Sequence, residues 1–586
     1  MPRAQPHTIS DNMVAGVVVA AGALWSMLWA SAALTSRLSG QPAPPTSLSS
    51  PIEAFAHAGD PAIAWGQPVG PAPLYWGVTV AILTVGLSAS VGVWLWTARQ
   101  ARRWEADPAR LSGVASRRDV GRVAGRRWLL KRADGLRPSL PRPDAADLGY
   151  RLGRSRGLDC YCSVEDSLVV LGPPRSGKGL HLVIPTILDA PGAVITTSTR
   201  PDNLTATLRA RAAIGPVAVF DPQRLAPGIP SATRWSPIRG CENPQTALIR
   251  AKALTTGAAS GTTDANFWQA SAEQAVRCLL HAAALGGRTC TDLYRWSLSA
   301  VQAREAVMIL SVHPKAAPSW HQALESIVTA DQRQRDSVWA MVSIAFAALA
   351  DPKVLAAVSP AEGEEFDPGT FLRAKGTVYL LGTSTGAAAT AGLVGAFVED
   401  VVEAARRIAA GSPAARLDPP LSLILDEAAN YPLPSLTSLM SEGGGTGIST
   451  LVVLQSLAQA RAVWGEHAAS AVWDAAIVKI VLGGGSNARD LEDLSKIIGQ
   501  RREPQRSTSI GADGRRSTSL STSQVPVMEP SRLRTLPFGT AILLLRSARP
   551  IVLSLSRWVD RKDATALVTA RDELEEVIQH AHAQAR

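Results

Sequence analysis

The sequence predicts an α/β protein: a parallel sheet that carries a phosphate-binding loop, an inserted block of helices, and two apolar helices ahead of both. Three observations predict this arrangement. An apolar run at 168–171 enters the motif G-x-x-x-x-G-K, which is typical of a loop that binds phosphate. Short apolar runs then alternate with helical segments. Finally, two uncharged stretches near the N-terminus are each long enough to cross a membrane.

The two uncharged stretches, 13–36 and 74–98, make residues 1–98 a predicted membrane anchor. Each covers a hydrocarbon layer of ~30 Å at a rise of ~1.5 Å per residue. A signal peptide cleaved after 30–32 is the alternative for the first stretch, although the apolar run is long for one. Arginines directly follow the second stretch, so the positive-inside rule places the remaining chain in the cytoplasm. We therefore expect a multi-pass protein of the plasma (inner) membrane.

Positive charge is concentrated just after the second stretch. The net charge is +10, and residues 99–156 hold sixteen Arg and Lys against six Asp and Glu, which is the same excess. The remaining chain is nearly balanced, which argues against a uniformly basic DNA-coating protein. We expect 99–156 to be a basic juxtamembrane linker against anionic lipid, with nucleic-acid binding as the alternative. The five cysteines lack zinc-site spacing and are expected to be free thiols.

The loop after the first apolar run is expected to bind the phosphates of ATP. Gly172 and Gly177 allow successive backbone N–H groups to point at an anion, and the following helix adds its positive end. Lys178 can reach the β- and γ-phosphates. Gly179 stands where the motif normally offers magnesium a hydroxyl. The predicted ATP-binding residues are Gly172, Pro173, Pro174, Arg175, Ser176, Gly177, Lys178, Gly179 and Leu180.

Polar side chains end two later apolar runs. The run 421–425 ends on Asp426 and Glu427, and the run 449–454 ends on Gln455. In a parallel sheet both ends lie beside the phosphates. We expect Asp426 to hold Mg²⁺ through water, Glu427 to polarise the attacking water, and Gln455 to sense the γ-phosphate or orient that water. The alternative is that these residues only cap the following helices.

The remaining segments complete the predicted domains. Residues 243–350 show helical periodicity, so we expect an all-helical domain inserted in a nucleotide-binding domain of 157–242 and 351–555. Ser- and Arg-rich arms at 501–528 predict an exposed hairpin, with a disordered loop as the alternative. Its arginines, Arg515 and Arg516, could meet a nucleic-acid backbone. Residues 556–586 are expected to form a C-terminal helix.

Several motifs together resemble the type IV secretion coupling proteins of the TraG/TraD kind, in particular actinobacterial conjugative DNA transfer proteins. They are G-P-P-R-S-G-K-G at 172–179 with V-I-P-T at 183–186, T-R-P-D at 199–202, L-D-E-A-A-N at 425–430 and L-Q-S-L-A-Q at 454–459. The family usually reads D-E-F-A-N, whereas this chain has Ala428. In this family a glycine often stands at the position of Gly179, so the missing hydroxyl argues less against hydrolysis.

The resemblance implies a RecA-like P-loop ATPase domain with a helical domain that receives the substrate. It implies homo-hexamers at the inner membrane, with ATP and Mg²⁺ driving DNA, expected to be single-stranded and joined to a relaxase, towards type IV secretion channel proteins. An arginine from a neighbouring subunit would stabilise the transition state, and the candidates are Arg489, Arg532 and Arg534. Two alternatives stay open: a double-stranded DNA translocase of the FtsK/HerA kind, and a non-hydrolysing substrate-docking receptor.

Overall fold

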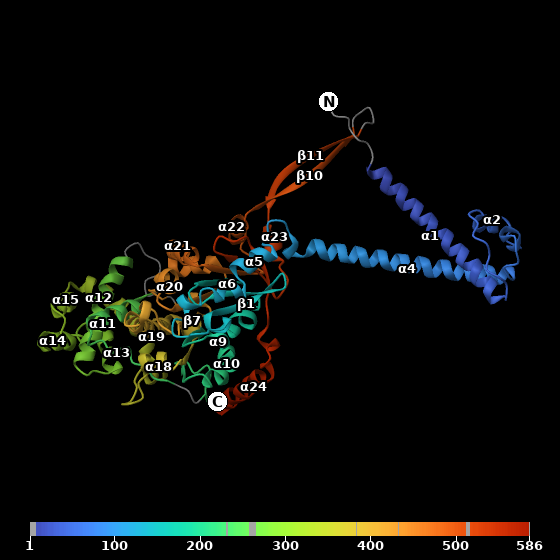
Figure 1. The fold of residues 1–586 in the computed structure, drawn as a ribbon. Coiled ribbons are helices and arrows are strands. Elements are labelled where there is room, and N and C mark those ends of the chain that lie inside the picture. Colours follow the sequence, from blue (N-terminus) through green and yellow to red (C-terminus); the bar gives the residue numbers. More distant parts are fainter. Residues whose placement is uncertain are drawn as a thin grey trace. The chain divides into compact units, whose positions relative to one another are not determined.

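The computed structural model describes residues 8–229, 233–256, 265–382, 384–431, 433–510 and 516–584. The chain divides into two compact units, Met1–Arg110 and Leu111–Arg586. In Figure 1 the first unit is blue, and the second runs from light blue to red.

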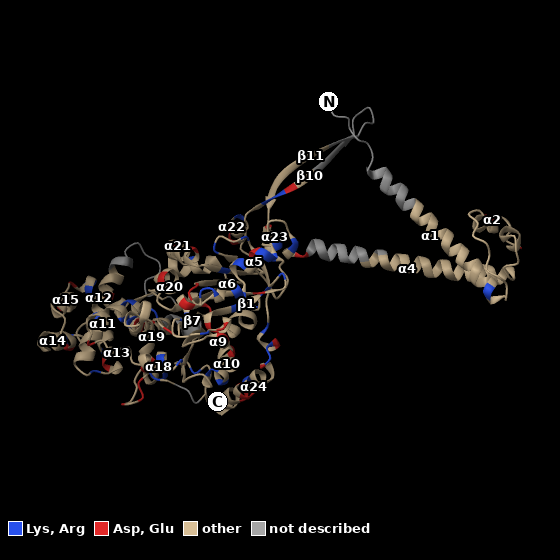
Figure 2. Ribbon diagram, viewed as in Figure 1, with Lys and Arg blue, Asp and Glu red and all other residues tan. Residues whose placement is uncertain are grey.

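The first unit is built on two long helices that pack against each other. Thr79 donates a hydrogen bond to Ser31 across them, at 3.0 Å between the hydroxyl oxygens. The segments Val18–Leu38 and Ala72–Val93 are long and apolar enough to cross a membrane, and Figure 2 shows them almost free of charge. Both lie within a few residues of the expected stretches. The helices of this unit are α1 (Thr8–Leu38), α2 (Ser50–Ala56), α3 (Ala62–Trp65), α4 (Ala72–Ala106) and the short 3₁₀ helix Pro108–Arg110.

The second unit is organised by one sheet, which holds eleven strands within the described residues, in the order β2-β1-β13-β12-β9-β3-β8-β7-β4-β6-β5. The seven strands from β9 to β5 are parallel and mostly buried, as expected where helices cover both faces. They are β3 (Leu168–Leu171), β4 (Val194–Ser198), β5 (Val217–Phe220), β6 (Thr377–Leu381), β7 (Leu421–Leu425), β8 (Ile448–Leu454) and β9 (Val478–Leu482).

The other four strands extend the sheet in antiparallel fashion. The last two along the chain, near 540–545 and 550–555, are short apolar runs of the kind that predicts strands, whereas the first two lie in or next to the stretch expected to be a basic linker. Tyr150 and Leu152 of β1 are buried while the arginines beside them are exposed. The strand therefore lies at the end of the arginine-rich stretch, with its arginines on the exposed face. The antiparallel strands are β1 (Gly149–Ser155), β2 (Leu158–Ser163), β12 (Thr540–Leu545) and β13 (Ile551–Ser554).

Most of the stretch 99–156, expected to be a linker against the membrane, belongs to the second unit, where it forms short helices after Leu111. Val120, Leu129 and Leu136 are at most 1% exposed and join the core against the sheet. The Arg546 guanidinium also lies over the Trp128 ring, 4.6 Å from its centre. This contact joins the stretch to the residue that follows β12. These helices are α5 (Arg117–Val123), α6 (Arg126–Leu130), α7 (Ala133–Leu136) and α8 (Ala145–Leu148).

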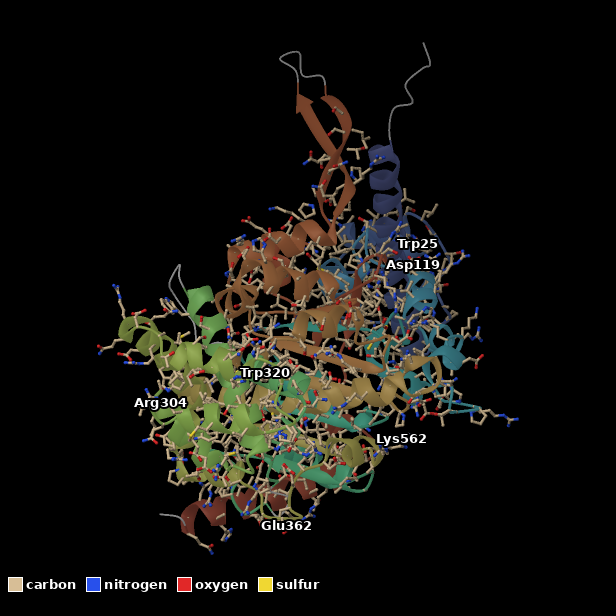
Figure 3. All side chains as sticks on the ribbon, turned by 90° about the vertical axis from the view of Figure 1, so that its left-hand side faces the viewer. Trp25, Asp119, Arg304, Trp320, Glu362 and Lys562 are labelled. Atoms are coloured by element: carbon tan, nitrogen blue, oxygen red, sulfur yellow. The ribbon has the colours of Figure 1, made fainter. Side chains whose placement is uncertain are left out.

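Between β5 and β6 the described residues form helices and loops only. Trp320, labelled in Figure 3, joins two of these helices through a ring contact with His281 at 5.0 Å and the Arg277 guanidinium at 5.1 Å. The helices continue past the expected boundary at 350 to Arg373. They are α11 (Pro244–Thr255), α12 (Ala265–Leu285), α13 (Cys290–Leu298), α14 (Arg304–Val312), α15 (Trp320–Val328), α16 (Gln332–Phe346), the 3₁₀ helix Ala347–Ala350, α17 (Pro352–Ala357) and α18 (Pro368–Arg373).

The remaining helices cover the sheet or follow its strands. Helix α10 packs against α24, and Leu204 of α10 shares a buried cluster with Leu574 and Ile578 of α24. The helices are α9 (Ile184–Asp189), α10 (Asp202–Ala212), α19 (Ser384–Ala410), α20 (Leu436–Glu442), α21 (Leu457–Ala475), α22 (Ala488–Ile498), α23 (Pro530–Arg534) and α24 (Ala564–Gln584), with short 3₁₀ helices at Pro413–Ala415, Ala428–Asn430 and Trp558–Asp560.

The Ser- and Arg-rich arms form the predicted hairpin, which projects from the second unit (Figure 1). Strands β10 (Gln500–Ile510) and β11 (Arg516–Pro526) pair in antiparallel register from Gln500 opposite Pro526 to Ile510 opposite Arg516. Residues 511–515 between them, including Arg515, lie outside the described part of the chain.

Candidate nucleotide-binding site

The phosphate loop joins β3 to a helix that begins as a single π turn, Gly179–Val183, and continues as α9. Pro185 lacks the N–H that a regular helix would use there, which accounts for the irregular turn. Arg175 and Gly177 take left-handed backbone conformations, with φ of 63° and 88°. These two reversals turn the chain sharply just before Lys178.

Lys178 folds back over its own loop. Its Nζ donates to the carbonyl oxygens of Gly172 at 2.6 Å and Pro173 at 3.1 Å. Burial lowers the pKa of Lys178, and the nearby carboxylates of Asp426 and Glu427 oppose that shift. The predicted phosphate-binding residues 172–180 thus form one continuous turn with the ammonium at its centre.

Asp426 follows the last residue of β7 and is deeply placed between strand ends. Its Oδ2 accepts a hydrogen bond from Asn203 Nδ2 at 3.3 Å, and its Oδ1 accepts one from the Glu427 N–H at 3.1 Å. Burial raises the pKa of Asp426 to about 6, and the hydrogen bond from Asn203 works against this. A neighbouring cation would favour the charged carboxylate.

Glu427 is held in a strained position and has three side-chain partners. Its φ of 49° and ψ of 46° are left-handed values that non-glycine residues seldom adopt, and such strain concentrates at functional sites. Its Oε2 accepts from Asn430 Nδ2 at 3.0 Å and Thr199 Oγ1 at 3.3 Å. Its Oε1 accepts from Gln455 Nε2 at 3.3 Å. The structure therefore brings Glu427 and Gln455 together from two strands.

Three partners of the carboxylates have no role in the prediction from sequence: Thr199, Asn203 and Asn430. Thr199 opens the T-R-P-D motif after β4 and Asn203 directly follows it; the end of β4 neighbours that of β7. Asn430 closes the L-D-E-A-A-N motif. Their places in or directly after these motifs are the available signal, but only the fold reveals which carboxylate each one contacts.

The candidate arginines are not drawn into this cluster. Arg489 is exposed and pairs with Glu466 at 3.1 Å, and Arg532 and Arg534 are both exposed on α23. Among the described residues, no hydrogen bond or ion pair joins any of the three to the phosphate loop. All three are exposed on the surface of the second unit.

A cavity of about 390 Å³ lies between the loop and the ends of β8 and β9. Gly172, Gln455 and Asn487 are among the residues that line it. Asp490, buried below it at the start of α22, accepts a hydrogen bond from the Leu457 N–H at 3.1 Å and pairs with Arg461 at 2.9 Å. The start of α21, which follows β8, is thereby fixed to α22.

The residues present fit a magnesium nucleotide. The loop presents backbone N–H groups and an ammonium, both of which suit phosphate. Within the described residues no cluster of three or more His, Cys, Asp or Glu could hold a metal ion. Mg²⁺ is commonly held by one or two carboxylates together with phosphate oxygens and water. Asp426 is the carboxylate placed for that task.

The sheet order, the loop after β3 and the carboxylates after β7 define a P-loop nucleotide-binding fold of the RecA-like kind. Residues 420–538 match the family model described as the TraM recognition site of TraD and TraG. No curated protein matches the chain by sequence. The family match confirms the predicted resemblance to the TraG/TraD coupling proteins.

Solved structures of the bacterial conjugative coupling protein TrwB share the fold. The unbound form of TrwBdeltaN70 is 18% identical, with a TM-score of 0.54 over 69% of this chain and 88% of that one. TrwB with the ATP analogue ADPNP, and with ADP and Mg²⁺, gives a TM-score of 0.52 in each case, at 18% identity over 69% of this chain and 89% of that one. These likenesses confirm the predicted fold class.

Proposed function

We propose that this protein is a membrane-anchored ATPase that couples a DNA–relaxase substrate to a type IV secretion channel. The observation that carries the proposal is the meeting of Lys178, Asp426, Glu427 and Gln455 around one loop, in a chain whose residues 420–538 match the TraD and TraG model. The two apolar helices of the first unit would anchor it in the inner membrane, with the second unit in the cytoplasm.

Each group has a defined task in hydrolysis. The loop and Lys178 bind the phosphates, and Asp426 would hold Mg²⁺, which would supply positive charge to neutralise them. Glu427 accepts the proton of the attacking water while Asn430 and Thr199 keep its carboxylate in place. Gln455 links that carboxylate to β8, so it can orient the water or sense the γ-phosphate. TrwB in complex with ADPNP, or with ADP and Mg²⁺, supports the same ligands here.

The functional assembly is proposed to be a homo-hexamer in which a neighbouring subunit completes the site. Arg489, Arg532 and Arg534 are the candidates for the completing group, since all three are exposed. Single alanine variants mixed with Lys178→Ala subunits would select among them. The required arginine, supplied by the Lys178→Ala subunit, would restore turnover in the mixture.

The test is the ATPase rate of the full-length protein in detergent, measured alone, with single-stranded DNA and with duplex DNA. Lys178→Ala is the control, because it removes the phosphate-binding ammonium. Stimulation by single-stranded DNA supports the coupling function. Preferential stimulation by duplex supports a translocase of the FtsK/HerA kind instead, and no turnover above the control would leave only a docking receptor.

A further inference from the structure

An exposed aromatic ring lies against the phosphate loop on the side away from the carboxylates. Phe538 is 66% exposed to solvent. Nevertheless it touches the loop, because a Cβ added to Gly177 would lie only 2.9 Å from Phe538 Cε2. The His181 ring is also adjacent, 5.2 Å from the Phe538 ring between centroids. One edge of Phe538 therefore meets protein while most of the ring faces solvent.

The backbone holds this ring in place. Thr540 N–H donates to the Pro537 carbonyl at 2.9 Å, which closes a tight turn around Phe538 and Gly539. Gly539 has a φ of 80°, as the third residue of a type II turn requires. Leu555 N–H donates to the Gly539 carbonyl at 2.8 Å, so the turn is also fixed to the strand end of β13. Phe538 is thus presented by a rigid turn, not by a loose loop.

The sheet order shows which part of a nucleotide would reach Phe538. The groups proposed to act on the γ-phosphate follow β7 and β8, on one side of β3. Phe538 precedes β12, which lies beyond β9 on the other side of β3. A triphosphate that crosses the loop with its γ-end at Glu427 must direct its ribose and base towards β12. Along the sheet, Glu427, the phosphate loop and Phe538 therefore follow in the same order as the γ-phosphate, the other phosphates and the base of one nucleotide.

We propose that Phe538 is the platform on which the base of the bound nucleotide stacks, which makes the ligand a purine nucleoside triphosphate and not merely a phosphate. This rests on the proposed nucleotide site at Lys178. The His181 ring is buried, and burial lowers its pKa; it packs against Phe538 from the protein side and leaves the exposed part of the Phe538 ring for the base. Stacking on a ring accepts any base but favours the larger purines, so ATP and GTP would bind alike and CTP less tightly.

The test compares ligands with and without a base on the full-length protein in detergent. Dissociation constants for Mg²⁺–ATP and for inorganic tripolyphosphate are measured for the wild type and for Phe538→Ala, Phe538→Tyr and Leu298→Ala. Loss of the ring is expected to weaken ATP binding by about five- to a hundredfold, the usual range for a stacked base, and to leave tripolyphosphate unchanged. Tyrosine should restore ATP binding. Leu298, 60% exposed on α13, controls for losing exposed apolar surface.

The outcomes separate the two proposals. Equal weakening of ATP and tripolyphosphate would mean that Phe538 only supports the loop, and unchanged ATP binding in Phe538→Ala would mean that no base rests there. Either result would contradict base stacking on Phe538 but not the nucleotide site at Lys178. If the wild type binds neither ATP nor tripolyphosphate, the proposed function fails first.

Discussion

The parallel and antiparallel parts of the sheet offer a nucleotide different chemistry. The parallel strands β7 and β8 end in a network of polar groups, with Asp426, Glu427 and Gln455 within one set of contacts. The antiparallel strand β12 is preceded by a fixed turn that presents an uncharged ring, Phe538. With the roles proposed above, reaction and recognition would be divided across β3, with the phosphate loop between them. Each part can therefore be altered separately.

The strongest test of the parallel part is Glu427→Gln, which keeps the shape of the side chain and removes its basicity. We expect kcat to fall by about a hundred- to ten-thousandfold, the usual contribution of a general base, while ATP still binds. Phosphate release gives kcat, and equilibrium binding gives the affinity. Glu442→Gln, at an exposed position on α20, should retain full activity. Undiminished turnover in Glu427→Gln would remove this carboxylate from the reaction.

The charge of Asp426 should make binding of Mg²⁺–ATP depend on pH. Its pKa of about 6 means that the carboxylate is mostly charged at pH 7.5 and mostly protonated at pH 5. Because Mg²⁺ needs the charged form, affinity should fall by about tenfold per pH unit below 6. Asp426→Asn should bind weakly at every pH, and any slope left in that variant reports the titration of ATP itself. Identical slopes in both proteins would contradict the assignment.

A smaller effect is expected from Gly539→Ala in the antiparallel part. Alanine at a φ of 80° costs about 1–2 kcal/mol, which the turn relieves by moving Phe538. ATP affinity should fall several-fold with little change for tripolyphosphate and no change in the pH profile. Gly363→Ala supplies the same strain at a φ of 84° in an open loop far along the chain, and its ATP affinity should be normal. A changed pH profile in Gly539→Ala would mean that the two parts are coupled.

The smallest expected effect comes from Asn203→Ala. Its amide lowers the pKa of Asp426, so its removal should raise the pH at which Mg²⁺–ATP binding is half lost by a fraction of a unit. Affinity at pH 8 should hardly change, since Asp426 is charged there in both proteins. A pH titration of binding measures the midpoint. An unmoved midpoint would show that the 3.3 Å contact is electrostatically unimportant.

The parallel part could be predicted from sequence because its signals are local. Apolar runs end directly on Asp426 and Gln455, and the loop motif precedes its helix, so neighbouring residues define each element. In the antiparallel part, β12 and β13 are apolar runs, but β1 lacks such a signal, because it alternates buried Tyr150 and Leu152 with arginines and its partner β13 is some four hundred residues away. For the same reason Asn203 and Asp426, 223 residues apart, could not be paired in advance.

The contacts of Asp490 have a mechanical consequence. They join the start of α21, which follows β8 after Gln455 and Ser456, to the start of α22, and α22 leads through Gly499 into β10. The eleven residues of β10 span ~35 Å at ~3.3 Å each. A tilt of ~5° at the base of such an arm displaces its far end by ~3 Å, by simple proportion from that length. A small rotation at the base of the hairpin would therefore become a large displacement at its far end. Helix α22, which leads into that base, is in contact with the segment that follows Gln455, the residue proposed to sense the γ-phosphate.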